Sequence, residues 1–550
     1  MTQKSILLID LPKQSHWKAR DKKRPNVLHP GLLLIRNIFE ENSINVDFIN
    51  VQGLYKRGVI DDNKNIYRQL LDIIDKKNPE IIGFSGYGNN YINIIVLSKK
   101  IKNNFPEKKI VLGGIQPTLT DKKTLEEFKQ IDYIIRGESE KAIPKFVEYL
   151  NGKEKIENVP NLSYRKNSEI KRNHIHVPSI NEVPPIKYRK KDFEYNCINQ
   201  DDYSFLLESG RGCPYNCSYC SSTTYWNKYR YKGLESIIEE IKKLKEKFNV
   251  NHIEFTSDQF AVDKKRIKKF CELIQPIDIT WFTQIRVDSL DKELINKMDN
   301  SGCKQTFFGV ESANNETLEK MNKDIKIEEA DELIHYLENN TNMNSDVGLL
   351  IGFPFETIKS IEDTLRKTFE YIEIGSTVWL NILVPLKGSQ LYKKHKEDLF
   401  FEEYFYGKLK DALVINREEE VNLIKEYKEF FSYYYKFRYE NFNYYYLRGL
   451  YNVISNMINN YPMTSLKWYK KIEKPLTEKI PEIMGWRDNF NISKKSFKRT
   501  MKSKVIKKEL EKYFKNHHDD EINEYMIKDK YGFKDSFSSK IGGLEKYDSL

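Results

Sequence analysis

The sequence predicts a large α/β protein in which two series of parallel strands precede a helical region. Short apolar runs alternate with amphipathic stretches over residues 1–151 and again over 201–398, and strand patterns then disappear over 399–550. Alternating strands and helices of this length form parallel sheets that are covered by helices. Residues 152–200 have weak periodicity and scattered prolines, so we expect a linker with a small hairpin there.

The first series contains five candidate strands and three clear helices. The strands are expected at residues 5–9, 45–50, 80–85, 109–112 and 133–135, and the helices at 32–41, 92–103 and 143–151. Glycines lie just beyond the last three strands. Because parallel sheets bind ligands at the carboxyl ends of their strands, these glycines predict a ligand site at that edge.

The second series contains six candidate strands, at residues 205–209, 252–256, 279–284, 305–310, 345–351 and 378–384. Successive strands begin about one βα unit apart, which leaves room for a helix between them. Six such units suit a partial (βα)6 barrel better than a closed barrel of eight strands.

The C-terminal region, 399–550, is predicted to be a mostly helical domain. Residues 402–451 are dense in Tyr and Phe, with Lys, Glu and Asn between them. We interpret these aromatic residues as core rather than as a surface on which a substrate stacks. The tail, including residues 536–543, is expected to be poorly ordered.

Composition excludes several classes of protein. Hydrophobic residues make up 39% and charged residues 31%, which is typical of a globular chain. No apolar run reaches the ~18–20 residues that span a bilayer, and the N-terminus lacks the long apolar stretch of a signal peptide. We therefore expect a cytoplasmic protein with no membrane span. The net charge is +11, but the lysines are interleaved with Asp and Glu, so nucleic-acid binding is not favoured.

Three of the six cysteines, Cys213, Cys217 and Cys220, lie within eight residues. Three cysteines are one ligand short of a structural zinc site, which normally needs four. Three thiolates are also one short of a fully protein-ligated iron–sulfur cluster, so a cluster held here would leave one iron open for a small molecule. Gly210 and Gly212 would let the loop backbone approach the cluster closely. The isolated cysteines, Cys197, Cys271 and Cys303, are expected to be ordinary core thiols.

This cysteine spacing, placed after a strand at the start of a six-unit βα series, resembles the radical S-adenosylmethionine (radical SAM) superfamily. The resemblance implies a four-iron four-sulfur (4Fe-4S) cluster whose open iron binds the amino and carboxylate groups of SAM. One electron from the cluster then cleaves SAM to a 5′-deoxyadenosyl radical, which abstracts hydrogen from an unactivated carbon. A flavodoxin- or ferredoxin-type protein is the implied electron donor.

The resemblance extends to the strand ends that follow, where relatives bind SAM through polar groups. It implies that SAM is bound by Tyr219, Asp258, Gln284, Arg286 and Glu311. Arg286 suits the SAM carboxylate because a guanidinium offers paired donors. Asp258 would meet the amino group, and Glu311 would accept from ribose hydroxyls. The segment 254–260 departs from the commoner Gly-Gly-Glu form, and the alternative role for each residue is a cap or a core hydrogen bond.

Four glycine-containing segments of the first domain, 30–34, 83–87, 113–118 and 136–140, together resemble the Rossmann-like cobalamin-binding domain that precedes many radical SAM enzymes. Glycines at strand ends would let a flat corrin and its nucleotide tail approach the backbone. The implied cobalamin contacts are Ser85, Gly86, Gly113, Gly114, Gln116, Gly137 and Glu138.

One departure concerns the cobalt ligand. Related cobalamin domains place a histidine under cobalt with an Asp-x-His-x-x-Gly motif, whereas Asp10 is followed here by Leu11 and Pro12, and His16 is out of register. Many radical SAM relatives also lack this histidine and bind cobalamin with its base detached. A domain that no longer binds corrinoid is the alternative.

The leading functional hypothesis is a cobalamin-dependent radical SAM methyltransferase that acts on an unactivated sp3 carbon of a natural product, peptide or lipid. One SAM would methylate cobalamin and a second would give the radical, and both cofactors must approach the substrate together. The helical domain would cap the barrel and select the substrate. The alternatives are a non-methylating reaction, such as cyclisation or ring rearrangement, a radical SAM enzyme with a degenerate cobalamin domain, an iron–sulfur electron carrier and, on charge alone, a tRNA-modifying protein.

Overall fold

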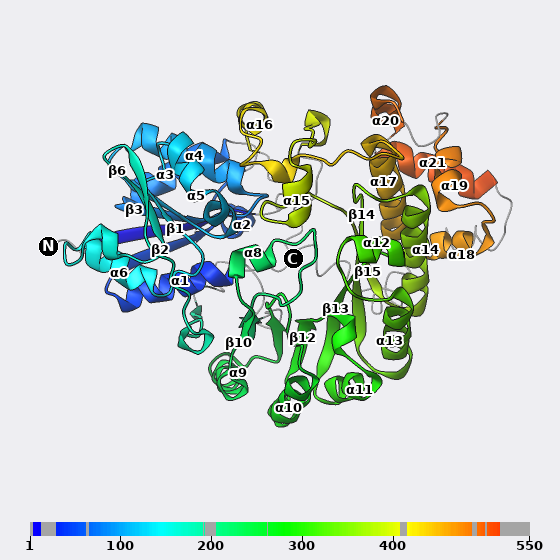
Figure 1. Cartoon of the computed structure of the whole chain (residues 1–550), viewed down its shortest axis with the longest axis horizontal. Helices are drawn as coiled ribbons and strands as arrows, with labels where there is room; N and C mark the ends of the chain where they lie inside the picture. Colours follow the sequence, from blue (N-terminus) through cyan, green and yellow to red (C-terminus); the bar gives the residue numbers. More distant parts are fainter. Residues whose placement is uncertain are drawn as a thin grey trace.

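The computed structural model describes residues 4–12, 29–61, 65–190, 192, 205–260, 262–406, 415–486, 492–500 and 503–516. Within these ranges the chain forms two sheet units and a helical region that contacts both (Figure 1). His16, Cys197 and the segment 536–543 lie outside the described residues. No helix within the described part of the chain is long and apolar enough to cross a membrane.

The N-terminal unit is a parallel sheet with helices on both faces, and its five expected strands are confirmed. The strand order is β2-β1-β3-β4-β5. The strands are β1 (Ser5–Asp10), β2 (Asn45–Asn50), β3 (Ile81–Ser85), β4 (Lys109–Gly113) and β5 (Tyr133–Ile135). The helices are α1 (Pro30–Glu41), α2 (Val51–Lys56), α3 (Ile66–Lys77), α4 (Tyr91–Asn104), α5 (Ile115–Glu127) and α6 (Ala142–Leu150).

Alternation along β1 explains the two covered faces. Ile6 and Leu8 belong to the apolar cluster of α1 and α6, whereas Leu7 and Ile9 belong to the cluster of α3 and α4. Successive side chains of a strand point to opposite faces, so both faces of this sheet must be buried. The chain passes from β1 to β2 on one side and returns to β3 on the other, which opens a crevice at the carboxyl ends of β1 and β3.

The segment 152–200, expected as a linker, contributes two strands to the same sheet. The expected hairpin forms from β6 (Leu162–Lys166) and β7 (Glu169–Arg172), and β6 pairs antiparallel with β5. Leu162 and Tyr164 are buried, so the hairpin closes the edge of the N-terminal core. The periodicity of these two short strands is too weak to place them in the sheet from the sequence.

The second unit is the predicted partial barrel, with six parallel strands in the order β15-β14-β13-β12-β11-β8. The strands are β8 (Phe205–Leu207), β11 (His252–Phe255), β12 (Thr280–Gln284), β13 (Cys303–Glu311), β14 (Asn344–Ile351) and β15 (Thr377–Ile382). The helices are α8 (Ser222–Trp226), α9 (Leu234–Phe248), α10 (Lys264–Ile274), α11 (Lys292–Asn300), α12 (Asn315–Lys320), α13 (Ile327–Asn340), α14 (Ile358–Ile374) and α15 (Gln390–His395). A two-stranded ribbon, β9 (Gly210–Arg211) with β10 (Arg230–Tyr231), follows β8.

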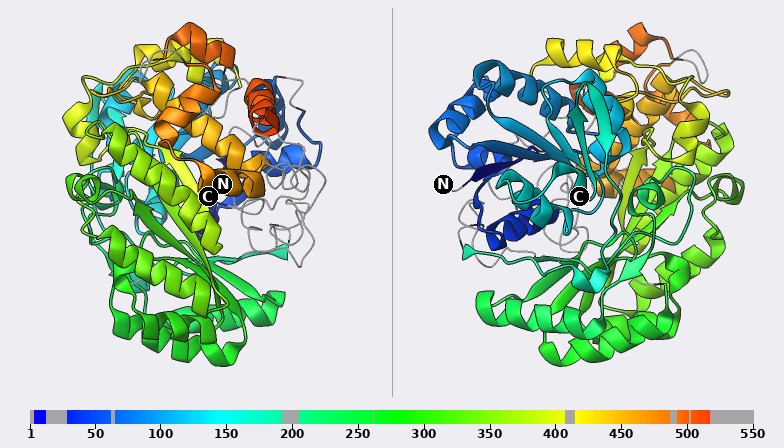
Figure 2. Two further views of the ribbon diagram at one scale, coloured as in Figure 1. Left: turned by 90° about the vertical axis from the view of Figure 1, so that its right-hand side faces the viewer. Right: turned by 60° about the vertical axis from the view of Figure 1, so that its left-hand side comes forward.

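The C-terminal region is helical, as predicted, and is joined to both sheet units. Its helices are α16 (Arg417–Glu426), α17 (Tyr444–Asn460), α18 (Pro462–Lys471), α19 (Leu476–Ile483), α20 (Lys494–Thr500) and α21 (Ser503–Asn516). Helix α16 packs on α4, and α17 packs on β15, so the region spans the two units (Figure 2). Its aromatic residues are mostly buried, including Phe430, Phe431 and Tyr434, which confirms their core role.

Candidate active site between the two sheets

The carboxyl ends of both sheets face one cavity of about 810 Å³. On the barrel side it is lined by the last motif cysteine, Cys220, and by Ser222 and Asp258. On the N-terminal side it is lined by residues that follow β1, β3, β4 and β5, among them Gly113 and Gly137. An apolar arm of the same cavity runs between the sheet and helices α1 and α6, and is lined by Ile6, Leu8, Leu34, Phe39, Val111 and Ile143.

The three motif cysteines lie on a loop that neighbouring elements hold at Ser218, between Cys217 and Cys220. The Ser218 amide donates to the Met321 carbonyl at 2.8 Å, and the Leu391 amide donates to the Ser218 carbonyl at 2.7 Å. Burial raises the pKa of Cys220 to about 12 and also raises the pKa of Cys213. Metal coordination is the interaction that makes such buried thiols stable as thiolates.

The three motif thiols are not arranged around one point, within the part of the chain that the structure describes. Among the described residues, no three His, Cys, Asp or Glu side chains converge closely enough to hold one metal ion. Each thiolate of an iron–sulfur cluster binds a different iron, so the sulfur atoms need not converge on one point.

Gly210 and Gly212 are needed for a close approach of two backbone segments. A Cβ at Gly210 would lie 2.6 Å from the Arg230 carbonyl, and a Cβ at Gly212 would lie 2.7 Å from the Lys228 carbonyl. Gly212 also has a φ of +81°. The two glycines therefore let the chain before the cysteines pass close to the 228–230 backbone. This close contact positions the cysteine loop.

Arg286, at the end of β12, contacts the cysteine loop directly. Its guanidinium group donates to Asp288 at 2.8 and 3.0 Å and to the Lys323 carbonyl at 2.6 Å. It lies 3.8 Å from the centre of the Tyr215 ring, and one nitrogen is 4.0 Å from the Cys217 sulfur. Arg286 is buried, so these contacts fix the loop from the barrel side. In this arrangement its paired donors are directed to Asp288.

Glu311 and Tyr219 meet at a lysine that the sequence analysis did not single out. The Lys323 ammonium group is 3.4 Å from both the Glu311 carboxylate and the Tyr219 hydroxyl. Glu311 has a φ of +73° at a break in the pairing of β13 with β14, a strained conformation typical of functional sites. Lys323 carries no sequence signal of its own, because it is one lysine in a lysine-rich chain.

Asp258 and Gln284 complete the row of predicted SAM residues at the carboxyl ends of β11 and β12. Asp258 is exposed to the cavity and accepts a hydrogen bond from the Ser222 hydroxyl. The Gln284 side chain is half-buried, and its backbone carbonyl accepts from the Phe260 amide at 3.0 Å. Four of the five predicted SAM residues therefore lie in or beside the cysteine loop: Arg286 is buried, Glu311 and Tyr219 are half-buried around Lys323, and Asp258 is exposed in the cavity.

Two predicted cobalamin glycines leave open space at the edge of the N-terminal sheet, whereas a third is needed by the fold. A Cβ at Gly137 would meet nothing within 4 Å, and one at Gly113 would only touch the Ile135 carbonyl at 3.7 Å. A Cβ at Gly114, which has a φ of +92°, would lie 2.8 Å from the Gly86 carbonyl oxygen. Gly114 therefore serves the close approach of two backbone segments.

Three other predicted cobalamin residues have protein partners. The Gly86 amide donates to the Gly113 carbonyl at 2.9 Å. The Gln116 side chain donates to the Phe430 carbonyl at 2.8 Å and so joins the N-terminal unit to the C-terminal region. The Glu138 carboxylate is paired with Arg211 and Arg230 of the barrel unit. Gly86 and Gln116 lie outside the lining of the cavity, while Glu138 and Ser85 are within it.

His29 also lines the cavity, just before α1, and its chemistry bears on the missing histidine motif. Its Nδ1 atom accepts a hydrogen bond from the Leu32 amide at 3.2 Å and so caps the helix. An imidazole that accepts at Nδ1 carries its proton at Nε2. His29 therefore has no lone pair available for a metal while the cap is intact, which agrees with a corrinoid bound without histidine coordination.

The residues on the N-terminal side of the cavity fit the expected cobalamin. The apolar arm suits the aromatic base of a detached nucleotide tail, and the open space at Gly113 and Gly137 suits a macrocycle that lies against the backbone. A buried carboxylate oxygen of Glu140, also in the lining, has no hydrogen-bond partner within the described part of the chain. The fold and the site together define an enzyme that combines an iron–sulfur barrel with a corrinoid domain.

Comparison with known families agrees with this definition. The model of the radical SAM superfamily matches residues 207–368, and the model of the B12 binding domain matches residues 21–147. The protein is a radical SAM enzyme with an N-terminal cobalamin-binding domain, and its cofactors are a 4Fe-4S cluster, SAM and cobalamin.

Two curated relatives differ in their reactions. An uncharacterized methyltransferase of Pyrococcus horikoshii is 26% identical over 340 residues, which cover 60% of this chain and 72% of that protein. An anaerobic magnesium-protoporphyrin IX monomethyl ester cyclase of Cereibacter sphaeroides is 28% identical over 278 residues, which cover 48% of this chain and 44% of that protein.

Two solved structures share the fold. The cobalamin-dependent SAM radical enzyme OxsB, with aqua-cobalamin and SAM bound, superposes with a TM-score of 0.62 and 15% identity, covering 100% of this chain and 85% of that one. The radical SAM methyltransferase TsrM from Kitasatospora setae, with cobalamin and a [4Fe-4S] cluster bound, gives a TM-score of 0.57 and 15% identity, covering 72% and 75%.

Proposed function

We propose that this enzyme is a cobalamin-dependent methyltransferase that methylates an unactivated sp3 carbon of a natural product or peptide. The observation that carries the proposal is the single cavity lined by Cys220 from the barrel and by Gly113 and Gly137 from the N-terminal sheet. A reaction that joins radical formation to methyl transfer needs both cofactors within reach of one substrate. A shared cavity meets that requirement without a domain movement.

The cofactors would supply the chemistry and the chain would supply their placement. When bound, the cluster would deliver the electron that cleaves SAM, and the corrinoid would carry the methyl group. Arg286 pairs with Asp288, packs on the Tyr215 ring and lies next to the Cys217 sulfur. These contacts hold the loop that carries Cys217. Asp258 presents a carboxylate to the cavity 38 residues after Cys220 in sequence but next to Ser222 in space. We propose it as the acceptor for the SAM amino group.

The proposal is tested by anaerobic reconstitution of the full chain with iron, sulfide and cobalamin, followed by incubation with a reductant and SAM carrying a 13C methyl group. Methyl transfer to the corrinoid does not require the substrate, so S-adenosylhomocysteine should form only when cobalamin is present. The same sample should also give 5′-deoxyadenosine. Mass spectrometry separates the two products.

A second function is favoured by the cyclase relative, which matches this chain at slightly higher identity than the methyltransferase does. In a non-methylating radical reaction, such as cyclisation or ring rearrangement, 5′-deoxyadenosine would form without S-adenosylhomocysteine. If the chain takes up no corrinoid under any condition, the N-terminal domain is degenerate and both cobalamin-dependent proposals fail.

The proposal also covers the electron donor and the C-terminal region. A flavodoxin- or ferredoxin-type protein would reduce the cluster in the cytoplasm. The C-terminal helical region would select the substrate, and among its described residues Tyr433 lines the cavity. Tyr433 lies against Gly88, which follows β3, so it stands beside the corrinoid edge.

A further inference from the structure

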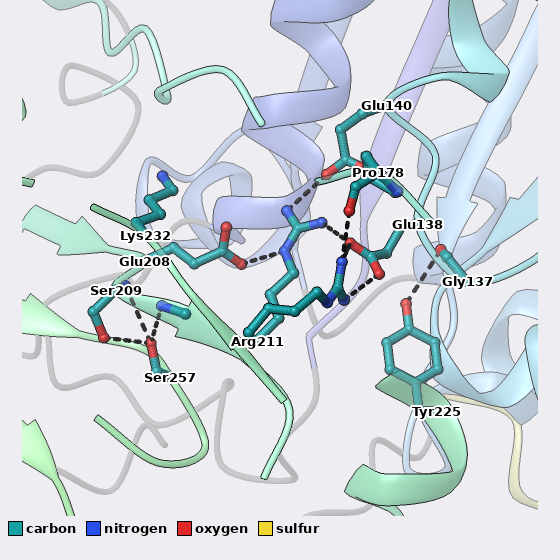
Figure 3. Close-up of polar contacts among 12 residues, drawn as sticks. Gly137, Glu138, Glu140, Pro178, Glu208, Ser209, Arg211, Tyr225, Lys232 and Ser257 are labelled. Atoms are coloured by element: carbon teal, nitrogen blue, oxygen red, sulfur yellow. Dashed lines mark hydrogen bonds and ion pairs between the residues drawn. The ribbon is translucent and has the colours of Figure 1, made fainter. Parts of the chain in front are cut away.

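A buried network of charged side chains joins the two sheet units beside the cavity. Arg211, two residues before Cys213, extends its guanidinium group into the N-terminal unit, as Figure 3 shows. It contacts Glu138 at 2.5 Å, Glu140 at 2.6 Å and Glu208 at 2.8 Å. Arg230 contacts Glu138 as well, at 2.5 Å. The network therefore connects the segment before the cysteine loop with the segment after β5.

The two partners of most interest, Arg211 and Glu140, are both deeply buried. Their side chains are 5% and 7% exposed. Removing charges from water is costly and is offset only by well-formed pairs, so this contact is geometrically fixed rather than fluctuating. The Arg211 guanidinium also lies 5.4 Å from the Trp226 ring, which restrains it from the barrel side.

Glu140 uses only one of its two carboxylate oxygens in this contact. Oε1 accepts from Arg211, whereas Oε2 is buried and has no hydrogen-bond partner among the residues that the structure describes. Glu140 lines the cavity that the two units share. A carboxylate can only accept hydrogen bonds, and a buried acceptor without a donor is unfavourable. The orphaned oxygen therefore indicates a ligand that brings a donor.

The position of Glu140 identifies which ligand this is. It follows β5, at the same sheet edge as the open glycines Gly113 and Gly137, which is the corrinoid side of the cavity. The periphery of a corrin ring carries several carboxamide groups, each a neutral N–H donor. We propose that Glu140 is a corrinoid-binding residue that accepts a hydrogen bond from one of these carboxamides, and that Arg211 is a positioning residue that holds its carboxylate from the cluster side.

The direct test compares Glu140→Gln with Glu208→Gln in the full chain carrying a reconstituted cluster. Both variants remove one carboxylate from Arg211, but only the first removes the charged acceptor with the orphaned oxygen. The probe is hydroxocobalamin, titrated by its absorbance. Loss of one hydrogen bond to a charged group corresponds to about a 10- to 150-fold weaker Kd, which we expect for Glu140→Gln. Glu208→Gln should stay within about 3-fold of the parent.

The positioning role of Arg211 is tested by Arg211→Lys alone and together with Glu140→Gln. Arg211 lies outside the cobalamin-binding domain, yet Arg211→Lys should weaken hydroxocobalamin binding. If it acts through Glu140, the double variant should bind no more weakly than Glu140→Gln alone. Iron content and melting temperature show whether each variant is folded. Additive losses would overturn the positioning role.

Three results would contradict this proposal without contradicting the methyltransferase assignment. It is wrong if Glu140→Gln binds hydroxocobalamin as the parent does, or if Glu140→Gln and Glu208→Gln weaken binding equally. It is also wrong if Glu140→Gln weakens SAM binding while corrinoid binding is unchanged. Each of these results can occur whether or not S-adenosylhomocysteine is formed, because the readout is corrinoid affinity rather than turnover.

Discussion

The two sheet edges that face the cavity are built in opposite ways. The barrel edge is filled with side chains that are paired with one another, such as Arg286 with Asp288 and Lys323 with Glu311. The edge of the N-terminal sheet is bare backbone at Gly113 and Gly137, beside an apolar arm. A small polar ligand is bound by side chains that reach toward it, whereas a large flat ligand needs space that side chains would otherwise fill. Deleting atoms should therefore damage the barrel site, and adding atoms should damage the corrinoid site.

The largest effect is expected at the cysteines, where deletion removes the cluster. Changing Cys213, Cys217 or Cys220 to Ala should remove most of the iron and abolish SAM cleavage, because a three-thiolate cluster has no spare protein ligand. Iron and sulfide analysis with EPR spectroscopy measures the loss. Cys271 and Cys303 are buried in the core, and replacing either should leave iron content unchanged. The radical SAM assignment fails if the triple alanine variant still produces 5′-deoxyadenosine.

Addition of a side chain at Gly113 tests the other edge. Gly113→Leu has room for its Cβ but would fill the cavity, so we expect loss of bound cobalamin with normal iron content. Gly114→Ala is the informative contrast, since its strain and its contact with the Gly86 backbone should lower stability by about 1–3 kcal/mol. Absorbance of the bound corrinoid and thermal melting separate the two effects. Normal cobalamin content in Gly113→Leu would contradict the comparison.

Arg286→Lys examines whether the paired side chains of the barrel edge hold the cluster loop or SAM. A lysine cannot replace the two donors to Asp288 or the flat contact with Tyr215. From these contacts we expect lower iron content and a changed EPR spectrum before SAM is added. The sequence-based expectation differs, since loss of a SAM carboxylate contact would weaken SAM binding about 10- to 150-fold with an unchanged cluster. A normal cluster with weak SAM binding would restore that interpretation.

Asp258→Ala is the matched variant for Arg286→Lys, because Asp258 is exposed in the cavity and accepts a hydrogen bond from Ser222, which follows the last motif cysteine by two residues. We expect roughly 10-fold weaker SAM binding from the loss of one charge-assisted contact, with the iron content of the parent. Isothermal titration under anaerobic conditions measures the affinity. If Asp258→Ala binds SAM normally, another carboxylate meets the amino group.

The prediction with the smallest expected effect on the two cofactor sites concerns two buried groups, Glu356 after β14 and Lys436 of the C-terminal region. Burial raises the pKa of Glu356 to about 7 and lowers the pKa of Lys436 to about 7. Because the folded state binds more protons than the unfolded state at Glu356, stability should fall as pH rises from 4.5 to 7. At Lys436 the folded state binds fewer protons, so stability should rise from pH 7 to 10.5.

The free energy of unfolding, and with it the melting temperature, should therefore pass through a minimum near pH 7, with an acidic arm on the order of 3 kcal/mol and an alkaline arm on the order of 5 kcal/mol. Glu356→Gln should flatten the acidic arm, and Lys436→Met should flatten the alkaline arm. Calorimetric scans of the three proteins across this range decide the question. Slopes that persist unchanged in both variants would show that other groups set the pH dependence.

The sequence by itself determined the fold class, the eleven strands of the two parallel series and the motif of three cysteines. These features are local, because strand periodicity and the spacing of Cys213, Cys217 and Cys220 are visible within short windows. It also indicated the sheet edges that bind ligands, since glycines and polar residues follow the strands directly. The hairpin of β6 and β7 was recognised as a hairpin but not as part of the sheet, because pairing with β5 leaves no local pattern.

Only the tertiary structure decided which partner each polar side chain has. Gln116 was expected at the corrinoid and contacts Phe430, 314 residues away. Glu138 was expected there as well and pairs with Arg211, 73 residues away, while one buried oxygen of Glu140 has no hydrogen-bond partner among the residues that the structure describes. Such pairings depend on how separate elements pack, and the energy of a buried charge depends on every group around it. A sequence shows which residues can carry out the chemistry. Packing decides whether each of them contacts a cofactor, holds a loop or pairs with another residue.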